Sequence, residues 1–111
     1  LCTSNLRPIV NASVEAGGLG DAFVGGRTVQ EDVIEKSTGV AQIKPLPNLY
    51  VMAVEKLKLP SKYVVAFEDS VVGVTSAKRA GVGTVLGVLN RADNTTTEAK
   101  EVEAALFAAG A

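Results

Sequence analysis

The sequence predicts an α/β fold with a parallel sheet, on three observations. Two short apolar runs, at residues 63–67 and 84–89, have the β-branched composition of buried strands, and the first is continuous enough to be covered on both faces. Segments with helical spacing and capping residues alternate with these runs. The 111 residues are 47% hydrophobic, which suits one domain with a core. Alternating strands and helices are typical of layered α/β folds.

Capping residues, prolines and glycines mark where each predicted helix begins and ends. We expect helices over Asn5–Ala16, from Pro47-Asn48 to Pro60, from Asp69 or Ser70 to Ala80-Gly81, and from Thr95, Thr96 or Thr97 onward. Ala22-Phe23-Val24 is a candidate strand, and Glu31 to Glu35 a candidate short helix. Both ends of the chain read as cuts through a domain, because it opens inside an apparent strand and closes on a helix stop at Gly110.

Composition excludes several classes of function. The formal net charge of −1 argues against a nucleic-acid or membrane-surface module. The chain has no histidine, which excludes catalysis by its own imidazole groups, and its single cysteine, Cys2, forms no internal disulfide. We find no apolar run long enough for a membrane span and no secretory signal. We therefore expect a cytoplasmic protein with no nucleic-acid or membrane partner.

Thr3, Ser4 and Asn5 follow the first predicted strand, where ligands bind in open parallel sheets. The Thr3 hydroxyl and the free N–H groups at the start of the next helix make a candidate anion site. Helix capping explains the same residues and is the commoner reason for them.

Lys44 precedes Pro45 and Pro47, which restrict the backbone around it. An ammonium group held in this way would neutralise a phosphate or a carboxylate. A solvated surface lysine before a helix is the more frequent case.

Glu68, Asp69 and Ser70 follow the most apolar strand. Two adjacent carboxylates suit a hard cation such as Mg²⁺, which takes oxygen ligands. Asp69 or Ser70 equally suits a helix cap, with Glu68 complementing the helix dipole, and the sequence leaves both readings open. Gly73 would let the following helix approach the sheet closely.

The order and spacing of these motifs resemble the haloacid dehalogenase superfamily, in its subfamily of small phosphatases and phosphomutases with a helical cap. The residues that carry the resemblance are Thr3, Lys44-Pro45-Leu46-Pro47, Glu68-Asp69-Ser70, Gly73 and Ala80-Gly81. The resemblance implies a doubly wound, Rossmann-like parallel sheet with helices on both faces. Residues 1–111 would be the C-terminal part of that core domain.

The resemblance also implies a magnesium-dependent phosphohydrolase that acts on a small phosphorylated metabolite. Thr3, with Ser4 and Asn5 after it, would bind the phosphoryl group. Lys44 would balance the negative charge of the phosphoryl group and of the nucleophile. The Mg²⁺ ligands would be Asp69, directly, and Glu68, directly or through water.

The chain departs from the family pattern because it contains no Asp-x-Asp motif. The nucleophile of the aspartyl-phosphate chemistry would then lie outside this chain, as would the helical cap. The missing nucleophile strand would separate the remaining strands into two pairs, with unpaired backbone groups between them. We therefore expect a fragment that is inactive alone and that needs a complementing chain or self-association.

Three alternative functions stay open. The first is a non-catalytic phosphate- or metal-binding, regulatory module of the same family. The second is phosphoryl transfer of the β-phosphoglucomutase type. The third, a receiver-like or flavin-binding domain, is weakest because it does not explain the Lys-Pro-x-Pro to Glu-Asp-Ser order.

Overall fold

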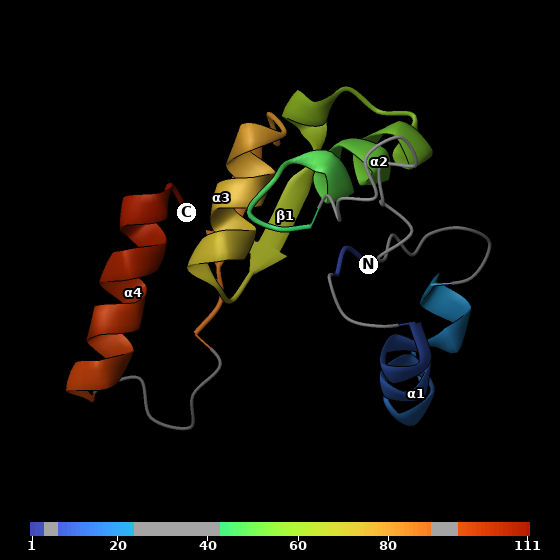
Figure 1. Ribbon diagram of the computed structural model, residues 1–111, viewed down its shortest axis with the longest axis horizontal. Coiled ribbons are helices and arrows are strands. Elements are labelled where there is room, and N and C mark those ends of the chain that lie inside the picture. The colour runs from blue at the N-terminus through green and yellow to red at the C-terminus, as the bar shows by residue number, and fades with distance from the viewer. Residues whose placement is uncertain (4–6, 24–42, 90–95) are drawn as a thin grey trace.

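The structure is a computed structural model that describes residues 1–3, 7–23, 43–89 and 96–111. Figure 1 shows α2 and α3 packed with the strands, with α4 beside α3 and with α1 apart from α3 and α4. The elements, in chain order, are α1 (Arg7–Ala16), the 3₁₀ helix η1 (Gly20–Phe23), α2 (Asn48–Leu57), the 3₁₀ helix η2 (Ser61–Tyr63), β1 (Val65–Glu68), α3 (Val71–Arg79), β2 (Thr84–Gly87) and α4 (Thr97–Ala109).

The strands β1 and β2 pair in parallel, with Val65 opposite Thr84 and Glu68 opposite Gly87. The helix α3 makes the crossover between them, as parallel pairing requires. Within the described residues the sheet has these two strands. The predicted α/β class with a parallel sheet and helices is confirmed.

The core lies where α3 meets the sheet. Val74 and Ala77 of α3 are fully buried, and they cluster with Ala66 of β1 and Val85 of β2. Leu106 of α4 closes the cluster from the side of β2. Burying a valine or leucine side chain contributes about 1.5–3 kcal/mol, and an alanine methyl group less. Since α3 contacts both strands and α4, it is the element that joins the sheet to its neighbours.

The two faces of β1 differ in burial. Ala66 and Glu68 are buried, whereas Val65 and Phe67 are 51% and 68% exposed. The continuous apolar run predicted a strand covered on both sides, and this expectation is wrong for the described residues. Side chains alternate along a strand, and α3 covers only the side of Ala66 and Glu68.

The helix caps follow the predicted signals. Ser70 caps α3 by accepting a hydrogen bond from the Gly73 N–H at 3.2 Å, and Thr96 caps α4 through the Ala99 N–H at 3.1 Å. These bonds satisfy N–H groups that a helix start leaves without partners. Of the candidate capping residues, the structure therefore selects Ser70 and Thr96.

The predicted strand at Ala22-Phe23 is wrong. Both residues lie in η1, and the Ala22 N–H bonds locally to the Leu19 carbonyl at 3.0 Å rather than to another strand. A run of three apolar residues after a glycine turn is too short to form a strand in competition with that local hydrogen bond. Cys2 takes a β-bridge position, whereas Ala22 and Phe23 are helical, so within the described residues the expected second pair of strands is limited to this bridge position. Val24 and the candidate helix at 31–35 lie outside the described residues.

No helix in the described part of the chain combines the length and the apolarity that crossing a membrane requires.

Candidate active site

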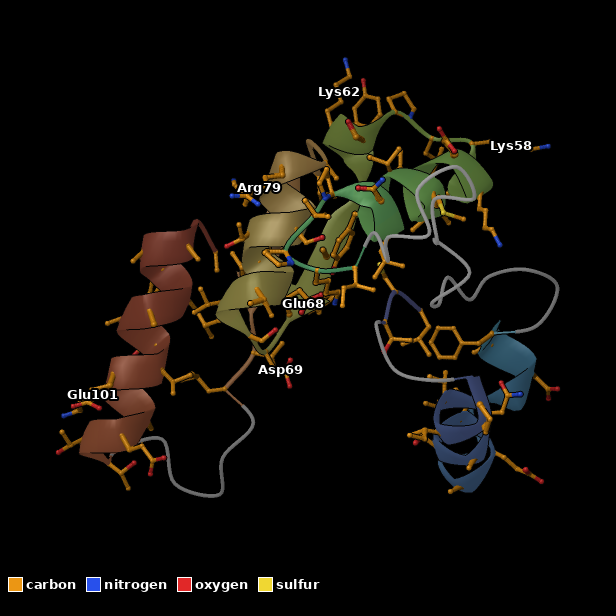
Figure 2. The ribbon with its side chains drawn as sticks, viewed as in Figure 1. Lys58, Lys62, Glu68, Asp69, Arg79 and Glu101 are labelled. Carbon is orange, nitrogen blue, oxygen red and sulfur yellow. The ribbon has the colours of Figure 1, made fainter. Side chains whose placement is uncertain are left out.

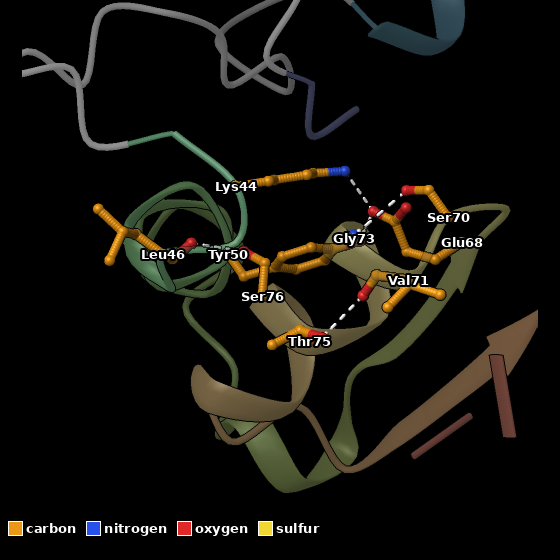
Figure 3. A network of polar contacts seen from close by, with 9 residues as sticks. All are labelled: Lys44, Leu46, Tyr50, Glu68, Ser70, Val71, Gly73, Thr75 and Ser76. Carbon is orange, nitrogen blue, oxygen red and sulfur yellow. Dashed lines mark hydrogen bonds and ion pairs between the residues drawn. The ribbon is translucent and has the colours of Figure 1, made fainter. Parts of the chain in front are cut away.

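The turn that carries Lys44 is held in place by α3. The fully buried Ser76 hydroxyl donates to the Leu46 carbonyl at 2.6 Å (Figure 3). Arg79 donates to the Pro45 carbonyl at 3.3 Å. The Lys44–Pro45 peptide bond is cis. Because α3 starts two residues after β1 ends, the same helix positions both the lysine turn and the carboxyl end of the strand.

Lys44, Tyr50 and Glu68 form a three-residue polar cluster at the carboxyl end of β1 (Figure 3). The Lys44 ammonium makes an ion pair with Oε1 of Glu68, and the Tyr50 hydroxyl donates to the same oxygen. The side chains of Lys44 and Glu68 are only 13% and 6% exposed. Burial is tolerated because each charge is paired and the carboxylate has a second, neutral donor.

Tyr50 also contacts Lys44 through its ring. The Lys44 Nζ lies 5.3 Å from the ring centroid, within the range of a cation–π interaction. Burial, followed by the hydrogen bond to Glu68, raises the pKa of Tyr50 well above its ordinary value. The phenol is therefore protonated at neutral pH and acts as a hydrogen-bond donor.

Because Gly73 has no side chain, the Glu68 carboxylate can occupy the space beside it. A Cβ added at this position would lie 1.8 Å from Oε2 of Glu68. The sequence predicted that Gly73 brings the helix close to the sheet, and the structure shows that the group in close contact is this carboxylate. Gly73 also donates its N–H to the capping Ser70, so α3 begins against the site.

Cys2 lies within the electrostatic reach of the cluster. Burial raises the pKa of the Cys2 thiol to about 11, with a smaller lowering by Lys44 and a smaller raising by Glu68. Cys2 also packs on the core cluster. The residue before Thr3 therefore lies against the core cluster that contains Tyr50, although the two segments are more than 40 positions apart in sequence.

Asp69 differs from its neighbour. Figure 2 shows Glu68 and Asp69 close together at the end of β1. The Asp69 side chain is exposed, and among the described residues it has no hydrogen-bond or ion-pair partner. Glu68 is thus the buried, paired carboxylate of the two, and Asp69 the accessible one.

The structure brings together some of the predicted site residues. Lys44 and Glu68 are in direct contact, and Asp69 follows Glu68 at the end of β1. Thr3 is half-buried, whereas Ser4 and Asn5 lie outside the described residues. Tyr50 was not singled out as a site residue from the sequence. Its hydroxyl at a buried position, six residues after Lys44, was the available signal.

The donor set suits a hard divalent cation in part. Asp69 and Glu68 offer carboxylate oxygens, the ligands that Mg²⁺ prefers. No hydrogen bond from the described residues reaches Oε2 of Glu68. Among the described residues, however, no group of three or more Asp, Glu, His or Cys side chains is gathered in one place. The described residues therefore fit a Mg²⁺ site to which they would supply two carboxylate ligands. The remaining ligands would come from groups other than these.

A family model described as haloacid dehalogenase-like hydrolase matches residues 1–81. The chain belongs to this family. The chain is 46% identical over 55 residues to protein CbbY of Rhodobacter capsulatus, covering 50% of this chain and 24% of that protein. It is 39% identical over 59 residues to the phosphorylated carbohydrates phosphatase of Thermotoga maritima, covering 53% of this chain and 27% of that protein. This haloacid dehalogenase-like chain thus spans about a quarter of the length of these relatives.

A solved structure supports the fold of this haloacid dehalogenase-like chain. The conserved haloacid dehalogenase-like protein of unknown function ATU0790 from Agrobacterium tumefaciens superposes with a TM-score of 0.76. The match covers 99% of this chain and 45% of that one, at 22% sequence identity. The likeness therefore establishes the fold, while the family membership rests on the family model.

Proposed function

We propose that the natural protein is a magnesium-dependent phosphohydrolase that acts on a small phosphorylated metabolite. One observation carries the proposal: the Lys44–Glu68 ion pair lies at the carboxyl end of a parallel strand, beside the accessible carboxylate of Asp69. The chain's membership of the hydrolase family supports it. The similar protein from Thermotoga maritima is named as a phosphatase of phosphorylated carbohydrates. A sugar phosphate is one kind of small phosphorylated metabolite.

In this proposal Lys44 stabilises negative charge. Its ammonium group balances the charge of the phosphoryl oxygens and of the attacking carboxylate. Thr3, followed by Ser4 and Asn5, binds the phosphoryl group through hydroxyl and backbone N–H donors. Phosphoryl transfer depends mainly on such positioning and on electrostatic stabilisation.

Asp69 and Glu68 are the residues of this chain that would hold Mg²⁺. When bound, the cation supplies positive charge to the phosphate oxygens. Because Lys44 and Tyr50 occupy Oε1 of Glu68, its Oε2 is the oxygen left for the cation or for a water molecule.

The nucleophile in this proposal is an aspartate outside the 111 residues. One of its carboxylate oxygens forms a bond to phosphorus, the bond from phosphorus to the ester oxygen breaks, and that oxygen takes up a proton from solvent water as the alcohol leaves. Water then cleaves the aspartyl-phosphate, which releases inorganic phosphate and restores the carboxylate. The strand that carries this aspartate would complete the sheet, either from the same protein or from a complementing chain.

Replacing Lys44 tests the proposal directly. In the natural protein we expect Lys44→Ala to lower kcat by roughly 10²–10³-fold, the loss typical of removing one group that stabilises transition-state charge. Turnover of sugar phosphates and of p-nitrophenyl phosphate is measured with Mg²⁺ and after EDTA treatment, which should abolish it. Lys62→Ala is the matched control, because Lys62 is an exposed lysine that also contacts a tyrosine ring.

Two results would contradict the proposal. Unchanged turnover in Lys44→Ala, with Lys62→Ala also unchanged, would remove Lys44 from the chemistry. Binding of inorganic phosphate and Mg²⁺ by the wild-type protein without turnover of any ester would instead indicate the non-catalytic module.

A further inference from the structure

We propose that Tyr50 is a positioning residue that holds the Lys44 ammonium and the Glu68 carboxylate in a fixed arrangement relative to each other. The inference deepens the proposed function and rests on it. It starts from an asymmetry between the two tyrosines of the chain. Tyr50 is buried and contacts both charged groups, whereas Tyr63 is 69% exposed and its ring contacts Lys62.

The first step is the hydroxyl of Tyr50. It donates to Oε1 of Glu68, the oxygen that also receives the Lys44 ammonium. A carboxylate oxygen accepts two such bonds, and with both in place the carboxylate is fixed in one orientation. Oε2 then has no donor among the described residues and remains available as a ligand.

The second step is the ring of Tyr50. The Lys44 Nζ lies 5.3 Å from its centroid, so the aromatic face supports the ammonium while Glu68 neutralises it. Lys44 would otherwise depend on a single ion pair to hold a long, flexible side chain. Tyr50 therefore acts on both partners of the pair, through two different parts of one side chain.

The third step is the rigidity of Tyr50 itself. Its side chain lies on α2, is 7% exposed, and belongs to the core cluster that contains Val74. A group anchored in the core transmits the geometry of the fold to the site. Lys44 and Glu68, which are 24 positions apart in the sequence, are thus bridged by one buried residue.

Tyr50→Phe is the central test, because it removes the hydroxyl and keeps the ring. In the natural protein we expect kcat to fall about tenfold, which is the size of effect for losing one hydrogen bond to a charged group. We expect KM to change less than twofold. The dissociation constant of Mg²⁺ alone, measured by calorimetry, should rise several-fold.

Tyr63→Phe is the matched control, and it should change none of these quantities. Tyr50→Leu removes the ring as well and should lower kcat further. A purely structural role predicts a lower melting temperature for Tyr50→Phe with unchanged kcat and unchanged Mg²⁺ affinity in the folded protein. That result would overturn the inference.

Failure of the proposed function is distinguishable from failure of this inference. If the wild-type protein neither hydrolyses esters nor binds Mg²⁺, the proposed function fails. The contact of Tyr50 with Lys44 and Glu68 is then tested by the melting temperatures of Tyr50→Phe, Lys44→Met and the double variant. Non-additive shifts support the contact of Tyr50 with the pair, and additive shifts overturn it.

Discussion

At the scale of single residues, the Glu68 carboxylate is enclosed by groups from three parts of the chain. Lys44 comes from the turn before α2, Tyr50 from α2 and Gly73 from the first turn of α3. Two of these neighbours donate to the carboxylate, and the third leaves it room. The identity of each neighbour is therefore constrained by one buried charge.

Gly73→Ala should disturb this enclosure, because the new methyl group would overlap Oε2 of Glu68. Displacing a buried, paired carboxylate costs about 3–5 kcal/mol, against a gain of about 1 kcal/mol from replacing glycine in a helix. We expect a net loss of about 2–4 kcal/mol in the free energy of unfolding. Urea titration measures it. Gly20→Ala is the control, since a Cβ there meets nothing within 4 Å, and equal stability of the two variants would contradict the prediction.

The chemistry-bearing residues were largely visible in the sequence. Lys44 stands out because it precedes two prolines, and Glu68 and Asp69 stand out because they come at the end of an apolar strand. That Glu68 is buried and Asp69 exposed was not visible in the sequence, since only the packing of α3 decides which of the two neighbouring carboxylates is covered. The role of Tyr50 was hidden for the same reason.

At the scale of elements, α3 connects the site to the core. Its buried face packs on both strands, its first turn adjoins Glu68, and its later turns hold the lysine turn through Ser76 and Arg79. The helix start was readable from the sequence as Asp69 or Ser70, and the structure selects Ser70. The hydrogen bond that ties α3 to the lysine turn was not readable from the sequence, because Ser76 and Leu46 are 30 residues apart.

Ser76→Ala should loosen this tether. We expect a loss of about 1 kcal/mol in the free energy of unfolding, the typical value for one hydrogen bond, together with a few-fold lower kcat. Thr75→Ala is the control on the same helix, because the Thr75 hydroxyl bonds only within α3, to the Val71 carbonyl at 2.8 Å. Urea titration and steady-state kinetics give the two readouts. A kcat equal to that of Thr75→Ala would argue against the tether.

At the scale of the whole molecule, one face of the sheet is open to solvent. Val65 and Phe67 expose apolar side chains on β1, within a sheet that has two strands in the described residues. Small sheets with an exposed apolar face are prone to pair with other chains. This property supports the proposal that the 111 residues associate with a complementing chain or with themselves.

Phe67→Lys should therefore reduce self-association of the 111-residue chain. We expect a concentration-dependent sedimentation coefficient for the wild-type chain and a largely monomeric one for the variant, because a charged side chain opposes pairing at the sheet. Phe107→Lys is the matched control, since Phe107 on α4 is exposed to a similar extent, 67% against 68%. A wild-type chain that is monomeric at all concentrations, or a larger effect of Phe107→Lys, would contradict the prediction.

Signals that act over a few neighbouring residues were enough to specify the α/β class, most helix limits and the motifs of the family. A cap, a proline or a buried strand is read locally, so Ser70, Thr96 and Pro47 indicated their helices correctly. Contacts between distant segments decided the rest. The apolar residues at 22–23 close a local turn instead of a strand, and Tyr50 reaches Glu68 across 18 residues. Such pairings depend on how α2, α3 and β1 pack together, because burial alone determines which polar groups lose water and must find a partner.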